Sequence, residues 1–158
     1  MFEKILVPLD GSKVGEAALP VLRHLADRCA PDMKISVTLI GVITLLRHWV
    51  VVGEASAPVS YTEEELSVIK NRISDYLEKT AASIGNAAID VKTMVVSGNA
   101  AEEILKAAER VHADLIAMST HGRSGLRRLA FGSITDKVLR VSKIPVLMVR
   151  APEGTINE

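Results

Sequence analysis

The sequence has a single cysteine, Cys29, among its 158 residues. One thiol cannot close a disulfide within the chain, and it cannot supply the ligand set of a structural zinc site. Cys29 falls on the apolar side of a predicted helix, so we interpret it as a buried structural thiol. Disulfide-stapled folds and zinc modules are therefore excluded.

The sequence also lacks an excess charge and a long hydrophobic run. Lys+Arg and Asp+Glu number 19 each, so no overall field attracts nucleic acid or an anionic membrane. The opening residues, MFEKILVPLDGS, contain no apolar signal-peptide core. The longest apolar stretch, residues 37–46, is too short for a bilayer and is interrupted by Thr and Gly. We expect a cytoplasmic protein with neither a nucleic-acid nor a membrane partner.

What the chain does have is apolar content, at 48% of residues, which favours a packed globule. The length suits one domain. We expect that domain to cover residues 1–151, followed by a flexible polar tail over residues 152–158.

Short apolar runs alternate with helical periodicity along the chain. Strands are predicted at residues 4–9, 34–42, 89–96, 114–118 and 145–149, and helices at 14–29, 63–84, 100–111 and 133–141. Ser12 is expected to cap the first helix and Pro20 to kink it. Such alternation predicts an α/β fold with parallel strands and helices on both faces of the sheet.

The connection over residues 43–61 is unusually long and contains the apolar run Trp49–Val52. Three interpretations are open: a lid over a ligand, a contact between subunits, or an irregular part of the core.

Glycines cluster between the fourth strand and the last helix, in STHGRSGLRRLAFGSITDKV. Glycine lets backbone N–H groups approach a ligand, and the N-terminus of a helix attracts anions. Hydroxyl groups and positive charge are added by Ser133, Thr135, Arg123, Arg127 and Arg128. The segment therefore favours a polyphosphate cradle at the carboxyl edge of the sheet, where open parallel sheets bind ligands.

This segment is neither a Walker loop, because it lacks G-K-[ST], nor a dinucleotide fingerprint, because it does not follow the first strand. An alternative is that Gly122 and Gly125 only form turns, and that Ser133 and Asp136 form a capping box.

The spacing Ser119-x2-Gly122-x9-Gly132-Ser133 resembles the Gly-x2-Gly-x9-Gly-[Ser/Thr] motif of the ATP-binding members of the universal stress protein family. Ser119 replaces the first glycine and adds a small side chain near the sugar–phosphate path. The initial ILVPLDGS and the final IPVLMVR look like the first and last strands of that family, so the resemblance covers nearly the whole chain.

The resemblance implies an open five-stranded parallel sheet in the order 3-2-1-4-5, Rossmann-like and adenine nucleotide alpha hydrolase-like. The switch point then lies between the first and fourth strands, and the crevice there faces both Asp10 and the glycine loop. Members of the family commonly pair their last strand in a homodimer, which implies the same for residues 145–149 here.

The resemblance also implies the residues of a nucleotide site. Asp10 would lie near adenine and ribose, the Val42 backbone would recognise adenine, and Met118 would pack near the nucleoside. The phosphates would lie along Gly122, Gly132, Ser133 and Thr135. The complete expected set is Pro8, Leu9, Asp10, Val42, Met118, Ser119, His121, Gly122, Arg123, Gly132, Ser133, Ile134 and Thr135.

Plainer interpretations stay open for several of these positions. Asp10 is also suited to a turn or a helix cap, while Val42 and Met118 also fit an ordinary core. For His121 we favour a role in holding the loop by hydrogen bonds over phosphate contact. Ser97 and Gly98 either border the ribose or form a tight turn.

The predicted function is an ATP-binding regulator of the stress response, with Mg²⁺ bridging the phosphates. One alternative is a slow or partner-dependent ATPase. Arg123 or Arg127 could stabilise the leaving charge, but the loop has no convincing acid or Gln to orient water, so no catalytic residue is assigned. A second alternative is a dimerisation module that binds no nucleotide. The retained glycine motif argues against this alternative.

Overall fold

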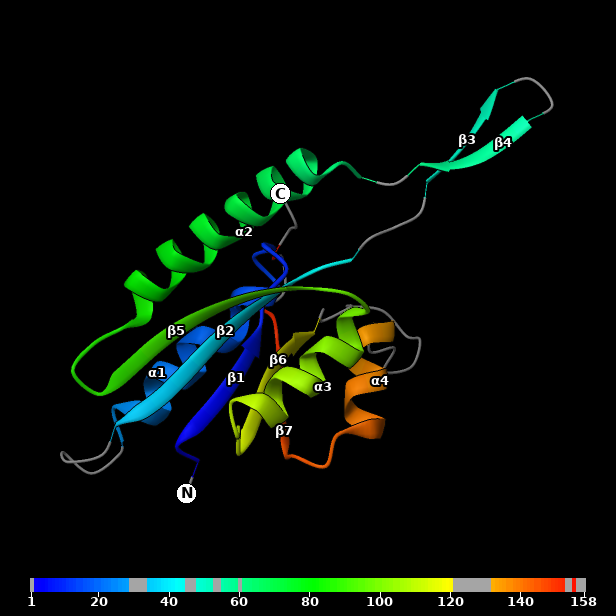
Figure 1. The fold of residues 1–158 in the computed structure, drawn as a ribbon. Helices are drawn as coiled ribbons and strands as arrows, with labels where there is room; N and C mark the ends of the chain where they lie inside the picture. Colours follow the sequence, from blue (N-terminus) through cyan, green and yellow to red (C-terminus); the bar gives the residue numbers. More distant parts are fainter. Residues whose placement is uncertain are drawn as a thin grey trace.

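The computed structural model describes residues 2–28, 34–44, 48–52, 55–59, 61–120, 132–152 and 155. Its main sheet has five strands in the order β5-β2-β1-β6-β7, all parallel (Figure 1). The strands are β1 Lys4–Pro8, β2 Ile35–Ile43, β5 Ile89–Ser97, β6 Leu115–Thr120 and β7 Val146–Arg150. Counted along the main sheet alone, this is the predicted order 3-2-1-4-5.

Helices cover both faces of the sheet. They are η1 Gly15–Ala17, which is a 3₁₀ turn, α1 Ala18–Ala26, α2 Glu63–Ile84, α3 Ala100–Arg110 and α4 Ser133–Val141. Buried residues of α1 and α2 share one hydrophobic cluster, and those of α3 and α4 share the other. Because side chains alternate along a strand, Ile5 and Val7 of β1 enter the first cluster and Leu6 enters the second.

The first helix differs from the prediction. The α-helical part begins only at Ala18, after the 3₁₀ turn, so Pro20 lies in its first turn. An N–H group at that position has no partner within a helix, so Pro20 interrupts no hydrogen bond. The expected mid-helix kink is therefore wrong. Ser12 does not cap α1 itself, whose N-cap residue is Ala17, but its Oγ accepts a hydrogen bond from the Gly15 N–H (3.0 Å) at the start of the 3₁₀ turn that precedes α1. Cys29 lies outside the described residues.

The long connection contains a hairpin that the sequence analysis missed. Strands β3 His48–Val52 and β4 Ala55–Val59 pair in antiparallel fashion and form a separate two-stranded sheet. Figure 1 shows this hairpin extending away from the main sheet, between β2 and α2. The connection is thus not irregular over these two strands, and the lid and subunit-contact interpretations remain predictions.

Helix α2 has the predicted bounds, and a local signal explains its start. The N-cap Thr62 accepts a hydrogen bond at Oγ1 from the Glu65 N–H (3.1 Å), while Glu65 Oε2 accepts one from the Thr62 N–H (2.8 Å).

Within the described part of the chain, no helix is both long and apolar enough to cross a bilayer. The predicted tail over residues 152–158 falls mostly outside that part.

Candidate functional site

A cavity of about 230 Å³ opens at the carboxyl edge of the sheet. Strands β1 and β6 are neighbours there, although α1, β2, α2, β5 and α3 lie between them in sequence. This is the switch point of the strand order, where open α/β sheets bind ligands. The described residues that line it come from the loop after β1, the end of β6 and the start of α4: Asp10, Ser12, Val14, Gly15, Ser119, Thr120, Gly132, Ser133, Ile134 and Thr135.

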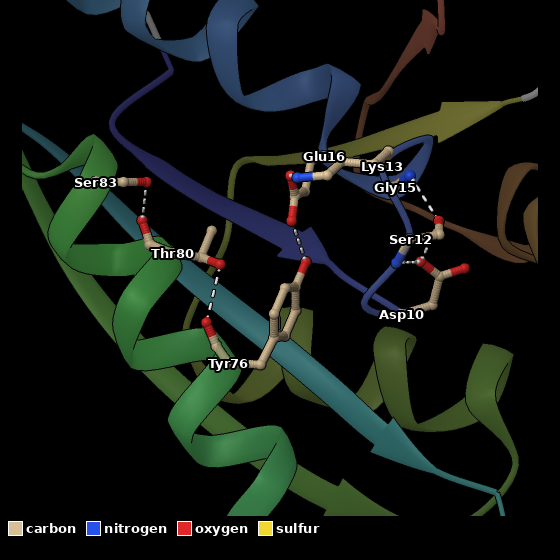
Figure 2. A network of polar contacts seen from close by, with 8 residues as sticks. All are labelled: Asp10, Ser12, Lys13, Gly15, Glu16, Tyr76, Thr80 and Ser83. Atoms are coloured by element: carbon tan, nitrogen blue, oxygen red, sulfur yellow. Dashed lines mark hydrogen bonds and ion pairs between the residues drawn. The ribbon is translucent and has the colours of Figure 1, made fainter. Parts of the chain in front are cut away.

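Asp10 organises the loop after β1. Its Oδ1 accepts hydrogen bonds from the Ser12 N–H (2.9 Å) and from Ser12 Oγ (2.6 Å). This is the Asx-turn geometry that aspartate favours. Figure 2 shows the second carboxylate oxygen pointing away from the turn. Asp10 is exposed and lines the cavity, so Oδ1 holds the turn while Oδ2 is available to a ligand.

Gly15 is a site residue that the sequence analysis did not identify. The Gly15 N–H donates a hydrogen bond to Ser12 Oγ (3.0 Å). A Cβ added at Gly15 would lie 2.6 Å from Asp10 Oδ1. No side chain fits at that separation while the carboxylate keeps its place. A glycine in the first turn of the helix predicted over residues 14–29, where glycine is unfavourable, was the available signal.

Ser119 lines the cavity at the end of β6, but its hydroxyl group bonds the protein itself. The Oγ donates to the Gly15 carbonyl (2.9 Å) and accepts from the Ala18 N–H (2.9 Å). A hydroxyl has one proton, so Ser119 has none left to donate to a phosphate. Its contribution to the cavity is therefore positional.

The N-terminus of α4 also lines the cavity. The N-cap residue is Gly132, which has no side chain with which to cap the helix. The capping-box interpretation of Ser133 and Asp136 is therefore wrong, because Ser133 is already helical and Asp136 pairs with Arg140 (Oδ2 to Nε, 2.8 Å). The first N–H groups of such a helix have no intrahelical partner and carry partial positive charge.

Several predicted site residues lie outside this cavity. Leu9 and Met118 are 6% exposed, and each belongs to one of the two hydrophobic clusters. Pro8 is half-buried at the end of β1. None of these three, nor Val42, is among the described lining residues. His121, Gly122 and Arg123 lie outside the described residues.

The backbone groups of Val42 nevertheless point to the side of β2 on which β1 lies. The Ile40 carbonyl accepts a hydrogen bond from the Leu9 N–H (2.9 Å), so the backbone groups of Ile40 point toward β1. Alternate residues of a strand direct their backbone groups to the same side. Val42 therefore directs its N–H and carbonyl groups to the β1 side, beyond Pro8 where that strand ends.

A second polar contact ties the cavity wall to α2. Tyr76 Oη donates to Glu16 Oε1 (3.0 Å), and Lys13 Nζ lies 3.7 Å from Glu16 Oε2 (Figure 2). Burial raises the pKa of Tyr76 well above its usual value, and the hydrogen bond to Glu16 raises it further. Tyr76 therefore remains a protonated donor that links α2 to the 3₁₀ turn next to Gly15.

Comparisons with known proteins show what the chain is similar to. It is 29% identical to the universal stress protein YxiE of Bacillus subtilis, covering 95% of this chain and all of YxiE. It is 30% identical to the universal stress protein MJ0531 of Methanocaldococcus jannaschii, with 97% of this chain and 85% of the relative covered. The solved structure of MJ0577 from the same organism superimposes with a TM-score of 0.66 at 27% identity, covering 98% of this chain and 99% of that one.

More distant solved structures share the fold. One is a universal stress protein in complex with cAMP (21% identity, TM-score 0.55), and another is an Arabidopsis thaliana family protein with AMP bound (13% identity, TM-score 0.56). The sequence profile of the universal stress protein family matches residues 1–150. The chain therefore belongs to the universal stress protein family.

Proposed function

We propose that this chain binds ATP in the cavity between β1 and β6 and acts in the cytoplasm as a nucleotide-dependent regulator of the stress response. The observation that carries the proposal is the N-terminus of α4, which begins at a glycine N-cap and lines the same cavity as Asp10. The first N–H groups of α4 can donate hydrogen bonds to an anion in this cavity, and the Asp10 carboxylate can accept them from hydroxyl or amino groups.

The phosphates fit the α4 side on electrostatic grounds. Backbone N–H groups at a helix N-terminus bind phosphate without further help, because they are unpaired and lie at the positive end of the helix dipole. The hydroxyl groups of Ser133 and Thr135 stand on the same first turn. Thr135 is buried, so a hydrogen bond from its hydroxyl would be partly shielded from water and correspondingly stronger.

The nucleoside fits the β1 side. Asp10 Oδ2 can accept from a ribose hydroxyl, and the outward backbone groups of Val42 match the donor and acceptor edge of adenine. The family proteins solved with AMP or cAMP support an adenine nucleotide as the ligand class.

Mg²⁺ fits as an ion held by the phosphates. Magnesium keeps several waters and typically binds through substrate phosphates and one or two carboxylates. In the described part of the chain there is no cluster of three or more His, Cys, Asp or Glu side chains that would hold a metal alone. The contributions of His121, Gly122 and Arg123 to phosphate binding stay predictions.

Titration with Mg-ATP by calorimetry tests the proposal. The wild-type protein is expected to bind, and Thr135→Val is expected to weaken binding by about tenfold or more, because a hydrogen bond to a charged group is worth about 1.5–3 kcal/mol. Valine keeps the shape of threonine but lacks the hydroxyl. The matched control Ser67→Ala, on the exposed part of α2, should bind like wild type. Absence of binding by the wild-type protein at millimolar ATP would end the proposal.

We also propose that two copies pair through β7. That strand bonds β6 on one side, and among the described strands it has no partner on the other. The unpaired N–H and carbonyl groups along such an edge can bond a strand of another chain. The Ile116 N–H donates to the Pro145 carbonyl, and the Ala151 N–H donates to the Thr120 carbonyl. Odd-numbered residues of β7 therefore face β6, and Met148 directs its N–H outward.

Met148→Pro is accordingly expected to remove an intermolecular hydrogen bond while the β6–β7 ladder persists. In sedimentation velocity, the wild type and Met148→Ala should run as dimers, and Met148→Pro should shift toward monomer with an unchanged circular dichroism spectrum. A wild-type monomer at high protein concentration would refute this assembly.

A further inference from the structure

Ser119 connects two parts of the chain that are far apart in sequence. Its Oγ lies 2.9 Å from both the Gly15 carbonyl oxygen and the Ala18 amide nitrogen, across separations of 104 and 101 residues. It thereby joins the end of β6 to the junction between η1 and α1.

The bond to Ala18 replaces a missing helix cap. Ala17 is the N-cap residue of α1 and makes no side-chain bond, because an alanine side chain carries no acceptor. Ala18 is completely buried, so water is poorly placed to satisfy its N–H group. Ser119 supplies a side-chain acceptor from β6, beside the Glu16 carbonyl, which also accepts from this N–H group. A glycine at position 119 would leave this N–H group without that partner.

The bond to Gly15 continues toward the ligand side of the cavity. The Gly15 N–H donates to Ser12 Oγ, and Ser12 Oγ donates to Asp10 Oδ1. Gly15 also stands so close to Asp10 that an added Cβ would be 2.6 Å from Oδ1. A shift of Gly15 is therefore passed on to the Asp10 carboxylate, both through hydrogen bonds and by direct contact.

We propose that Ser119 is a positioning residue for the nucleotide site: its hydroxyl holds the η1–α1 junction against β6 and so fixes where Asp10 presents its free oxygen. This inference rests on the proposed function. Ser119, which replaces the first glycine of the resembled motif, would then support binding by holding other residues of the protein in place. It would not contact the ligand itself.

A double-mutant cycle between Ser119 and Asp10 tests the inference. Calorimetric titration with Mg-ATP would compare wild type, Ser119→Ala, Asp10→Ala and the double variant. Ser119→Ala is expected to weaken binding about tenfold in the wild-type background and to have little effect in the Asp10→Ala background, because it acts through Asp10. Ser119→Thr, which keeps the hydroxyl, is expected to restore most of the affinity.

A role of Ser119 in overall stability alone would give the same loss in both backgrounds, and that result would overturn the inference. Unchanged or tighter binding by Ser119→Ala or Ser119→Gly would overturn it as well.

Amide exchange measured by NMR separates this inference from the proposed function. Ser119→Ala should lose protection at the Ala18 amide and shift the amide resonances of Ser12 and Gly15, with or without nucleotide. If wild type binds no ATP but these changes occur, the proposed function fails and the positional link stands. If the Ser12 and Gly15 resonances do not move, the link itself is refuted.

Discussion

Replacing Gly132 by aspartate is expected to weaken ATP binding by at least about a hundredfold without destabilising the fold. An aspartate at this N-cap position would accept hydrogen bonds from the N–H groups of α4 that the phosphates are proposed to use, and its charge would repel them. Like charges brought together at a binding site cost several kcal/mol.

The stability of this variant should be equal to or slightly above that of the wild type. A Cβ at Gly132 meets no atom of the described residues within 4 Å, and the backbone angles there, φ −55° and ψ 152°, suit any residue. Aspartate is also a good N-cap, better than glycine by a few tenths of a kcal/mol. Affinity and stability thus respond differently to the same substitution.

Calorimetric titration and urea unfolding measure the two quantities. Gly132→Ala is the control, because it adds a methyl group without a charge or an acceptor, and its affinity should lie between those of wild type and Gly132→Asp. Wild-type affinity in Gly132→Asp would show that phosphates do not bind at the start of α4.

Replacing Gly41 by alanine is expected to lower the free energy of unfolding by about 1–3 kcal/mol, the usual cost of overpacking a core. Gly41 is buried in β2 beneath α2, and an added Cβ would lie 2.5 Å from Ile73 Cγ2. Isoleucine is branched at Cβ, so this methyl group cannot easily rotate away. Helix α2 must therefore shift or Ile73 must strain.

Urea unfolding of Gly41→Ala, Ile73→Ala and the double variant measures the clash. The double variant should lose less stability than the sum of the two single losses, because truncating Ile73 vacates the space that the new methyl group needs. Gly132→Ala serves as the control for a glycine-to-alanine change, because a Cβ there meets none of the described atoms within 4 Å. An unfolding midpoint of Gly41→Ala equal to that of wild type would contradict the prediction.

The elements that were predicted well are those with strong local signals. Helices α2 and α4 begin and end at the expected residues, because their apolar positions recur at helical spacing over the whole element. The parallel strands were recognisable as short apolar runs bounded by turn residues, and the strand order came from the resemblance to a family that the comparisons confirm.

The hairpin was missed, although β3 covers the apolar run Trp49–Val52, because the sequence of β4 does not look like that of a strand. Pro58 lies within β4, opposite Trp49 of β3, and a proline usually argues against a strand. In a two-stranded sheet every strand is an edge strand, and there the missing N–H group can face outward. The hairpin forms because two short segments pair with each other, and neither segment alone predicts that pairing.

By itself, the sequence determined the alternation of strands and helices, and with it the edge of the sheet at which a ligand would bind. The spacing of apolar residues and the residues that favour turns are local properties, so both are visible in the sequence itself. Only the tertiary structure decided how the cavity is built. It brought the Ser119 hydroxyl within hydrogen-bonding distance of Gly15 and Ala18, and it set Gly15 close to Asp10. It also started α4 at a glycine N-cap. The bonds to Ser119 join residues more than 100 positions apart, and no local pattern specifies such a contact before the sheet has brought β1 and β6 together.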